Sequence, residues 1–427
     1  MTTEKMEGSK TMEERDSSGR LPLTSSTHLN GLLSIRQVLY DAFLPIGYPD
    51  SVTPDYLGYQ TFDSLQAFFS TITSLLANRA ILQGLGVGDA SSSATYALLL
   101  TILKDGISRV ATIAFAYRFG LVIEPECKKY RFLADIFNDS AFFLDLFSPL
   151  FSNGTKVFML VVAEALRAMC GVAAGASKAA LSKHFARRNN LSELNAKESS
   201  QETAVGLFGL FVGSIVVRHV ERREAVFSLM VTLVFVHLAM NYFGVRRVQL
   251  NVLNQQRATI LFEHYLETGE VLTPAKVADR ERIVYWSPVA KHVGEPVAKL
   301  AFANGIADTI QPKAVSVRHY DGEYPSFRLC ICRSQNALPI IKVLLLGDPM
   351  RLEAGDTTII RAWYSALALA HSDDFSTSKE TSKGEVEDSE VIELIEQMGK
   401  AGWDVDGANL EGSAPWVMDG DAGKKEL

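Results

Sequence analysis

Residues 225–245 read AVFSLMVTLVFVHLAMNYFGV, and this stretch decides the class of fold. It contains no charged side chain, whereas ERRE precedes it closely and two arginines follow it. As an α-helix it would extend about 31 Å, which matches the ~30 Å hydrocarbon core of a bilayer. A helix inside a soluble protein usually shows a polar face, which this stretch largely lacks. We therefore expect a membrane-embedded helix here rather than a buried soluble one.

The segment before it, TAVGLFGLFVGSIVV at 203–217, is apolar but too short to cross a bilayer by itself. A short charged loop joins the two segments, so a helical hairpin is expected. Gly209 and Gly213 are four apart and would let another helix approach closely.

Four further apolar segments, at 65–88, 93–123, 132–151 and 156–181, carry internal charges. Asp105 and Arg109 are four apart, and Glu164 and Arg167 are three apart, so each pair shares a helix face. Paired charges within apolar helices usually face a bundle interior, where we place both pairs. The region between residues 56 and 245 should hold about six helices, of which only 225–245 would be identified as a span from hydropathy.

The chain changes character after residue 247. An amphipathic helix ending at Gly269, a helix starting at Thr273-Pro274 and a final helix near 358–371 are expected. The runs FRLCICR and LPIIKVLLL predict an antiparallel strand pair. The predicted fold is mainly α: a helical membrane-associated bundle of about six helices, followed by a small α+β domain. The expected divisions are a disordered stretch (1–22), the membrane region (23–248), the α+β domain (249–371), an acidic linker (372–390) and an acidic terminal segment with a short helix (391–427).

Charge is unevenly distributed. The net charge is −7, and acidic side chains greatly outnumber basic ones after residue 372, whereas the preceding residues are near neutral. A nucleic-acid-binding protein would need a basic stripe, so that class is excluded. The first residues contain no apolar core typical of a signal peptide, and we expect none. The spacing of the four cysteines favours reduced thiols over a metal site.

Catalytic motifs are not apparent in the sequence. HExxH, GxSxG and Walker patterns do not occur, and the eight histidines are scattered. GLGVGDASSSA, at 84–94, superficially matches a dinucleotide-binding turn, but a helical segment precedes it, so we interpret it as a loop between helices. The sequence therefore predicts no enzyme, no cofactor and no metal.

A basic cluster occurs in SKAALSKHFARRNN, at 177–190. It comprises Lys178, Lys183, His184, Arg187 and Arg188. We favour a membrane flank that touches anionic lipid headgroups. The alternative is an anion or phosphate site, assisted by the start of a following helix near Lys197.

A proline-rich stretch, LPIGYPDSVTPDYLGYQ at 44–60, precedes the first apolar segment. Its prolines disfavour helix directly before them, and Asp55 or Thr53 could cap a helix starting near Tyr56. It is either a rigid segment at the membrane interface or an ordinary loop, because turn chemistry alone selects the same residues.

Several ordered segments resemble one family. They are the proline-rich stretch with its continuation to Phe68, LANRAILQGLGVGDASSSAT, LKDGISRVATIAFAYRFG, FLADIFNDSAFFL, and GASKAALSKHFARRNNLSELNAKESSQET. Together they resemble the signatures of the root UVB sensitive (RUS) family, also called DUF647, over about residues 44–213. The resemblance implies a membrane-associated protein; plant members act in UV-B tolerance and vitamin B6 homeostasis as a complex of two paralogues. It brings no enzymatic activity and no catalytic residues.

We predict a non-enzymatic integral membrane protein, working as a scaffold with a second copy or a paralogue and contacting membrane lipids. One alternative is a half-transporter-like bundle that moves a small solute after dimerising. Another is an enzyme acting on a phosphorylated small molecule. The candidate binding residues are Asp105, Arg109, Lys178, His184, Lys197, Gln201 and Glu202.

Overall fold

A computed structural model describes residues 31–84, 94–292, 294–305, 308, 327–334, 337–346, 357–372, 388–406 and 410. The predicted disordered stretch 1–22, the loop after Gly84, nearly all of the acidic linker and the end of the terminal segment lie outside the described residues. The contacts divide the chain into residues 1–44 and 45–427. The first unit contains helix α1 (Gly31–Phe43), which the sequence did not predict. The predicted domain boundary between residues 248 and 249 stays a prediction.

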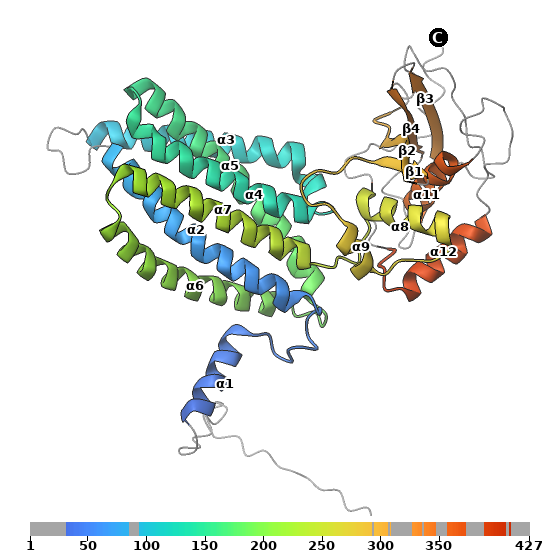
Figure 1. Cartoon of the computed structure of the whole chain (residues 1–427), viewed down its shortest axis with the longest axis horizontal. Coiled ribbons are helices and arrows are strands. Elements are labelled where there is room, and N and C mark those ends of the chain that lie inside the picture. Colours follow the sequence, from blue (N-terminus) through green and yellow to red (C-terminus); the bar gives the residue numbers. More distant parts are fainter. Residues whose placement is uncertain are drawn as a thin grey trace, which may run out of the picture. The chain divides into compact units, whose positions relative to one another are not determined.

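The described part of residues 56–247 forms six α-helices, as expected (Figure 1). They are α2 (Tyr56–Gly84), α3 (Ala94–Ile123), α4 (Cys127–Phe147), α5 (Asn153–Phe185), α6 (Leu191–His219) and α7 (Arg223–Arg247), with a short 3₁₀ turn, η1 (Ser148–Leu150), after α4. α2 begins at Tyr56, two residues after the last proline of the proline-rich stretch, as predicted. The mainly helical fold class is confirmed.

Helix α2 lies between α6 and α7 and packs against both (Figure 1). The expected hairpin of α6 and α7 is therefore wrong in its packing, because α2 separates two helices that a short connection joins. The close approach at Gly209 and Gly213 is confirmed, since a Cβ on Gly209 would lie 3.0 Å from Thr71 Cβ of α2. Arg79 of α2 also donates to the carbonyls of Val217 and Val220 at the end of α6.

The other side of the bundle is formed by α4, α5 and α3. α4 packs against α2, α5 and α7, whereas α3 has extensive contacts with α5 alone among the described elements. α3 is therefore an edge helix, as Figure 1 shows.

Three helices, α5, α6 and α7, are long and apolar enough to cross a membrane. We expected only residues 225–245 to qualify. The segment 203–217 looked too short because its helix actually begins at Leu191 and extends over 29 residues. α5 qualifies because its apolar residues outweigh the two charged residues, Glu164 and Arg167, in its most apolar stretch.

The C-terminal part is a small α+β domain. Helices α8 (Gln255–Thr268), α9 (Pro274–Arg280), α11 (Thr358–His371) and α12 (Asp388–Lys400) accompany four strands. Strands β1 (Val289–His292), β2 (Glu295–Phe302), β3 (Phe327–Ser334) and β4 (Ala337–Leu345) form a sheet in the order β1-β2-β4-β3. The predicted antiparallel pair is confirmed as β3 and β4, whereas β1 and β2 were missed. In the core of this domain, the sheet packs against α8, α11 and α12 around the buried Trp363 and Phe262.

Two candidate functional sites

Polar residues inside the helical bundle form the first candidate site. Arg131, Asp135 and Asp139 follow one another at four-residue spacing on α4, so they lie along one face of that helix. His237 and Asn241 face them from α7. All five side chains are buried. We call this set, together with Tyr59, Asp63 and Gln66 of α2, the polar core.

At one end of the polar core, Arg131 joins α4 to α2. Its guanidinium donates to Asp63 Oδ1 at 2.6 Å and to the Tyr59 hydroxyl at 3.2 Å. The Tyr59 hydroxyl in turn donates to Asp63. This buried charge therefore has a carboxylate and a hydroxyl as partners.

In the middle of the polar core, the Asp135 carboxylate accepts hydrogen bonds from side chains of two helices. Gln66 Nε2 donates to Asp135 Oδ2 at 2.5 Å, and Asn241 Nδ2 donates to the same oxygen. His237 Nε2 lies 3.5 Å from this oxygen, while His237 Nδ1 lies 2.8 Å from Asp139 Oδ2. The imidazole thus bridges two carboxylates that are one helical turn apart.

Two atoms of this site remain without a hydrogen-bond partner in the part of the chain that the structure describes. They are Asp139 Oδ1 and Asn241 Oδ1, both fully buried. Buried polar atoms are nearly always hydrogen-bonded, so these two acceptors are places where an ordered water or a donor group of a ligand would bind.

A second string of charges continues along α4 and α5. Arg167 pairs with Asp145 and lies 3.7 Å from Glu164, which in turn is 3.1 Å from Lys104 of α3. The predicted pairing of Glu164 and Arg167 is therefore confirmed. From Arg131 to Asp145, the polar positions of α4 cover roughly 21 Å at ~1.5 Å per residue.

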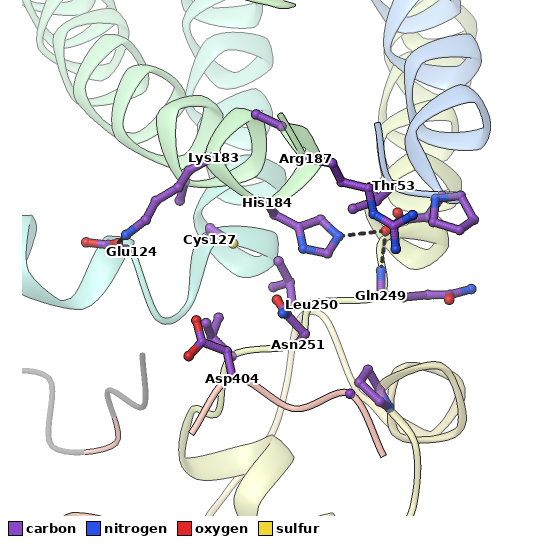
Figure 2. A pocket seen from close by; sticks show the side chains of 17 residues that line it. Thr53, Glu124, Cys127, Lys183, His184, Arg187, Gln249, Leu250, Asn251 and Asp404 are labelled. Carbon is purple, nitrogen blue, oxygen red and sulfur yellow. Dashed lines mark hydrogen bonds and ion pairs between the residues drawn. The ribbon is translucent and has the colours of Figure 1, made fainter. Parts of the chain in front are cut away.

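A pocket of about 400 Å³ forms the second candidate site, where the end of α5 meets residues 249–252 and the C-terminal domain. Figure 2 shows His184 and Gln249 on one side of this pocket and Lys183 with Glu124 on the other. His184 Nε2 lies 3.0 Å from Asp55 Oδ2, which also accepts the backbone N–H of Gln249 at 2.6 Å. Burial alone would raise the pKa of Asp55, but His184 and the hydrogen bonds to the carboxylate lower it below its usual value.

The pocket contains both signs of charge. Lys183 pairs with Glu124 at 3.4 Å, and Arg187 and Asp404 also line the cavity. The carboxylates of Asp55, Glu124 and Asp404 offset the cationic side chains, which does not favour a phosphate. The choice between lipid flank and anion site for the basic cluster stays open.

Of the other predicted site residues, the structure brings Lys178 and Glu202 together. Lys178 pairs with Glu202 between α5 and α6, and Gln201 Nε2 lies 3.5 Å from the Tyr56 hydroxyl. Lys197 lies on α6, one turn before Gln201. Among the described residues, the seven candidates thus divide among the pocket, the contact between α5 and α6, and α3.

Our placement of Asp105 and Arg109 in the bundle interior is wrong. Both side chains are exposed on α3, and they form no ion pair with each other. Lys104, next to Asp105, is the residue that turns inward to reach Glu164. The four-residue spacing correctly predicted that Asp105 and Arg109 share a helix face, but it does not predict whether that face is buried.

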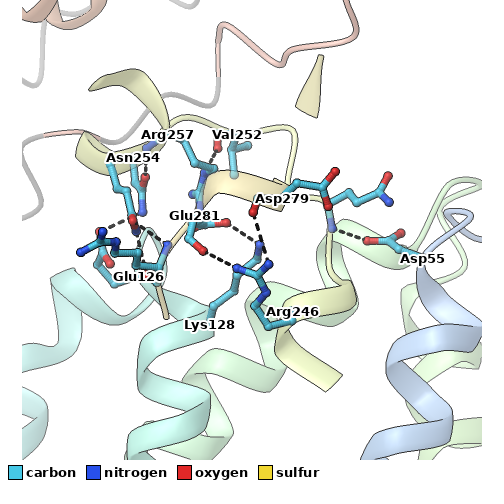
Figure 3. A network of polar contacts seen from close by, with 12 residues as sticks. Asp55, Glu126, Lys128, Arg246, Val252, Asn254, Arg257, Asp279 and Glu281 are labelled. Carbon is cyan, nitrogen blue, oxygen red and sulfur yellow. Dashed lines mark hydrogen bonds and ion pairs between the residues drawn. The ribbon is translucent and has the colours of Figure 1, made fainter. Parts of the chain in front are cut away.

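A buried polar network connects the helical bundle to the C-terminal domain. Glu281, after α9, pairs with Lys128 of α4 and with Arg257 of α8, the latter at 2.8 Å (Figure 3). Arg246 of α7 donates to the Glu281 carbonyl, and Asn254 donates to Glu126. We call these contacts the junction network. Because Glu281 contacts both regions, it couples the end of the bundle to α8 and α9.

Comparison with known proteins identifies the family. A family model described as "Vitamin B6 photo-protection and homoeostasis domain" matches residues 31–269, more than half of the chain. The chain belongs to the root UVB sensitive family. The match covers α1 to α8, and so the whole polar core and most of the junction network.

Named relatives of this family support the assignment. "RUS family member 1" of Dictyostelium discoideum is 41% identical over 58% of this chain, and the match spans 48% of that protein. "Protein root UVB sensitive 3" of Arabidopsis thaliana is 29% identical, and 98% of each chain is covered. "Protein root UVB sensitive 2, chloroplastic", from the same plant, is 31% identical over 57% of this chain and 55% of its own length. No solved structure matches.

The polar core was not predicted from the sequence, although the spacing of its residues pointed to it. Asp135 and Asp139 lie within an amphipathic apolar segment of the sequence, and His237 and Asn241 are polar positions within the apolar run 225–245. Both pairs have four-residue spacing, so each predicts a polar face. Two such faces in neighbouring apolar helices would have been the signal that they meet.

Proposed function

We propose that this protein is an integral membrane protein whose polar core handles a small polar solute or protons inside the helical bundle. The observation that supports this most strongly is the continuous set of buried polar and ionisable groups on α2, α4 and α7. In a bilayer, such groups are costly and mark solute pathways or proton relays.

Stability alone does not account for these residues. Replacing buried ion pairs with well-packed apolar side chains is often neutral or stabilising, by about 1–4 kcal/mol. A protein that served only as a scaffold would not need His237 between two carboxylates. The two orphaned acceptors, Asp139 Oδ1 and Asn241 Oδ1, supply places where a donor group of a solute could bind.

Vitamin B6 compounds are the first solutes to test, because the family model is described by that vitamin. Pyridoxine and pyridoxal carry hydroxyl donors and a ring nitrogen, which suit a cluster of carboxylates, an imidazole and amides. We propose binding and movement of the solute without chemical conversion.

The test uses the full chain in detergent and in liposomes. We expect pyridoxine, pyridoxal or pyridoxal phosphate to raise the unfolding temperature, since a ligand at 100 times its Kd stabilises by about 2.7 kcal/mol. His237→Gln and Asp139→Asn should abolish that shift, together with vitamer uptake or proton flux in liposomes. His219→Gln, at the exposed end of α6, serves as the matched control and should behave as wild type. The proposal fails if no vitamer binds and no proton flux occurs, or if both persist in the His237 and Asp139 variants.

A scaffold is the second candidate function, and the junction network favours it. That network would hold the C-terminal domain at the end of a membrane bundle, where partners could dock on it. Complementation of cells that lack the protein, measured as growth, would separate the two functions. If His237→Gln, expressed in these cells, restores growth fully, the scaffold is preferred.

A further inference from the structure

The region where α2, α5 and α6 meet contains a buried carboxylate that does not belong to the polar core. Glu198 of α6 is 3% exposed, and the Ser182 hydroxyl of α5 donates to its Oε2 at 3.2 Å. Among the described residues, this neutral hydroxyl is the one hydrogen-bond donor to Glu198. A carboxylate offers about four acceptor positions, so most of the acceptor capacity of this group remains open.

The charges around Glu198 compensate one another and leave Glu198 without a counterion. Lys178 of α5 acts on Glu198 electrostatically, but it pairs with Glu202. Asp63 of α2 also lies within electrostatic range, and Arg131 compensates its charge at 2.6 Å. One negative charge is therefore left over in a buried place, which is costly unless a cation joins it.

Gln60 of α2 is a second polar group with open hydrogen-bonding capacity. Its side chain is 5% exposed, and neither its amide nitrogen nor its amide oxygen has a partner in the part of the chain that the structure describes. Gln60 lies one turn after Tyr56, whose hydroxyl is 3.5 Å from Gln201 of α6. It also lies three turns before Thr71, which packs against Gly209 of α6. Gln60 therefore shares the side of α2 that faces α6, the helix that carries Glu198.

Glu198 lies between the polar core and the surface. Tyr56 and Tyr59 of α2 are close enough to Glu198 to interact with it electrostatically, and Tyr59 belongs to the polar core. Toward the surface, Glu202 follows Glu198 by one turn of α6. The side chains of Glu202 and its partner Lys178 are 37% and 31% exposed, so this ion pair marks the outer end of the site.

We infer that Glu198 and Gln60 form an entry site that binds a small cationic molecule, such as a hydroxylated compound with a protonated amine, before it reaches the polar core. The Glu198 carboxylate pairs with the cationic nitrogen, and the Gln60 amide supplies one donor and one acceptor for neighbouring polar groups. Anionic compounds are disfavoured because they meet an uncompensated carboxylate. The entry site rests on the proposed function, since it needs a solute that moves on to the polar core.

Thiol labelling of the full chain in native membranes tests the entry site without a solute. Gln60→Cys should react with a trimethylammonium methanethiosulfonate faster than with the sulfonate analogue, by about tenfold or more, because Glu198 attracts the cation. Each rate is first divided by the rate of the same reagent with a free thiol. The substitution breaks no described hydrogen bond, since the Gln60 amide has none. Peptide mass spectrometry locates the label, so the four native cysteines do not interfere.

Three further variants show whether this preference comes from Glu198. Glu198→Gln should remove most of the preference of Gln60→Cys for the cation. Glu221→Gln, which changes an exposed carboxylate after α6, is the matched control and should leave the preference unchanged. Ala77→Cys, at a position of α2 buried among apolar side chains, should react with neither reagent. The preference itself is measured with Glu198 in place, so it does not depend on the folding of Glu198→Gln.

Calorimetry with pyridoxamine, which carries a protonated amine, connects the entry site to the proposed function. Glu198→Gln should weaken pyridoxamine binding about tenfold, as expected for the loss of one charge-assisted hydrogen bond, and should weaken binding of the anionic pyridoxal phosphate less. An unreactive residue 60, equal labelling by both reagents, or unchanged pyridoxamine binding in Glu198→Gln would overturn the entry site. The proposed function would survive those results if His237→Gln still abolished transport. Charge-selective labelling in a protein that moves neither vitamers nor protons would support a cation site at Glu198 and contradict the proposed function alone.

Discussion

Glu281 shows what a single residue contributes to this fold. Its carboxylate is 4% exposed and lies between Lys128 and Arg257, which belong to two different parts of the chain. Burial alone would raise the pKa of this carboxyl, but the two cations and their hydrogen bonds lower it below 4.5. The ionised form is therefore the one that stabilises the junction network.

This arrangement predicts a loss of stability in acid. Because the pKa is lower in the folded than in the unfolded chain, the contribution of Glu281 is complete above about pH 4.5. It is lost as the pH falls through the folded-state pKa. Glu281→Gln should destabilise the protein by about 3–5 kcal/mol at neutral pH, since Lys128 and Arg257 would keep buried charges without a counterion. The substitution should also weaken the dependence of stability on pH below pH 4.5.

Thermal unfolding of the full chain in detergent between pH 3.5 and 7 would measure both effects. Glu396→Gln provides the control, because Glu396 also has a lowered pKa and a lysine partner, Lys400, but is exposed on α12. Its replacement should change the unfolding temperature little. Equal effects of the two substitutions would contradict the structural role of Glu281.

At the scale of elements, the contact between α2 and α6 depends on glycine. A Cβ on Gly209 would lie 3.0 Å from Thr71 Cβ and 3.3 Å from the Phe68 carbonyl oxygen. Neither neighbour is the free end of a long side chain, so neither can move aside easily. Close packing of this kind matters most where helices cannot gain stability from the hydrophobic effect.

We predict that Gly209→Ala destabilises the protein by about 1–3 kcal/mol through overpacking. Gly206→Ala, three residues earlier on the same helix, has no atom within 4 Å of the added Cβ and should stabilise by up to roughly 1 kcal/mol through helix propensity. Chemical unfolding in detergent would compare the two. Equal stability of the two alanine variants would contradict close packing at Gly209.

At the scale of the whole molecule, the proposed membrane placement predicts that exposed positions differ in their tolerance of a charged side chain. Phe235, at the middle of α7, is 75% exposed, and Tyr285 in the C-terminal part is 80% exposed. In a protein surrounded by water, arginine would be tolerated equally at both. In a bilayer, arginine at the centre of a spanning helix costs about 2.5–3.5 kcal/mol or more.

We therefore expect Phe235→Arg to reduce the amount of protein in the membrane fraction, whereas Tyr285→Arg should leave it unchanged. Wild type should stay in the pellet after carbonate washing. Release of wild type by carbonate, or equal tolerance of both arginines, would show that the bundle does not span the membrane.

The local features of this chain were predictable because they depend on neighbours in sequence. The apolar run before Arg246, the turn residues before Tyr56 and Gly269 after α8 identified helices and their ends. Short runs rich in β-branched or apolar residues identified β3 and β4. Strand β1 was missed because it has only four residues, and β2 was missed because it pairs with β4 in parallel, a long-range contact that no local pattern reports.

The sequence by itself determined the helical class, the six helices of the bundle, the α+β domain after them and the family resemblance. Only the tertiary structure decided which side of each helix is buried. Asp105 and Arg109 were expected inside and lie outside, whereas Asp135, Asp139, His237 and Asn241 form the interior. Helical spacing defines a face but not its neighbour, because the neighbour is supplied by helices far away in the chain. The insertion of α2 between α6 and α7 was unpredictable for the same reason.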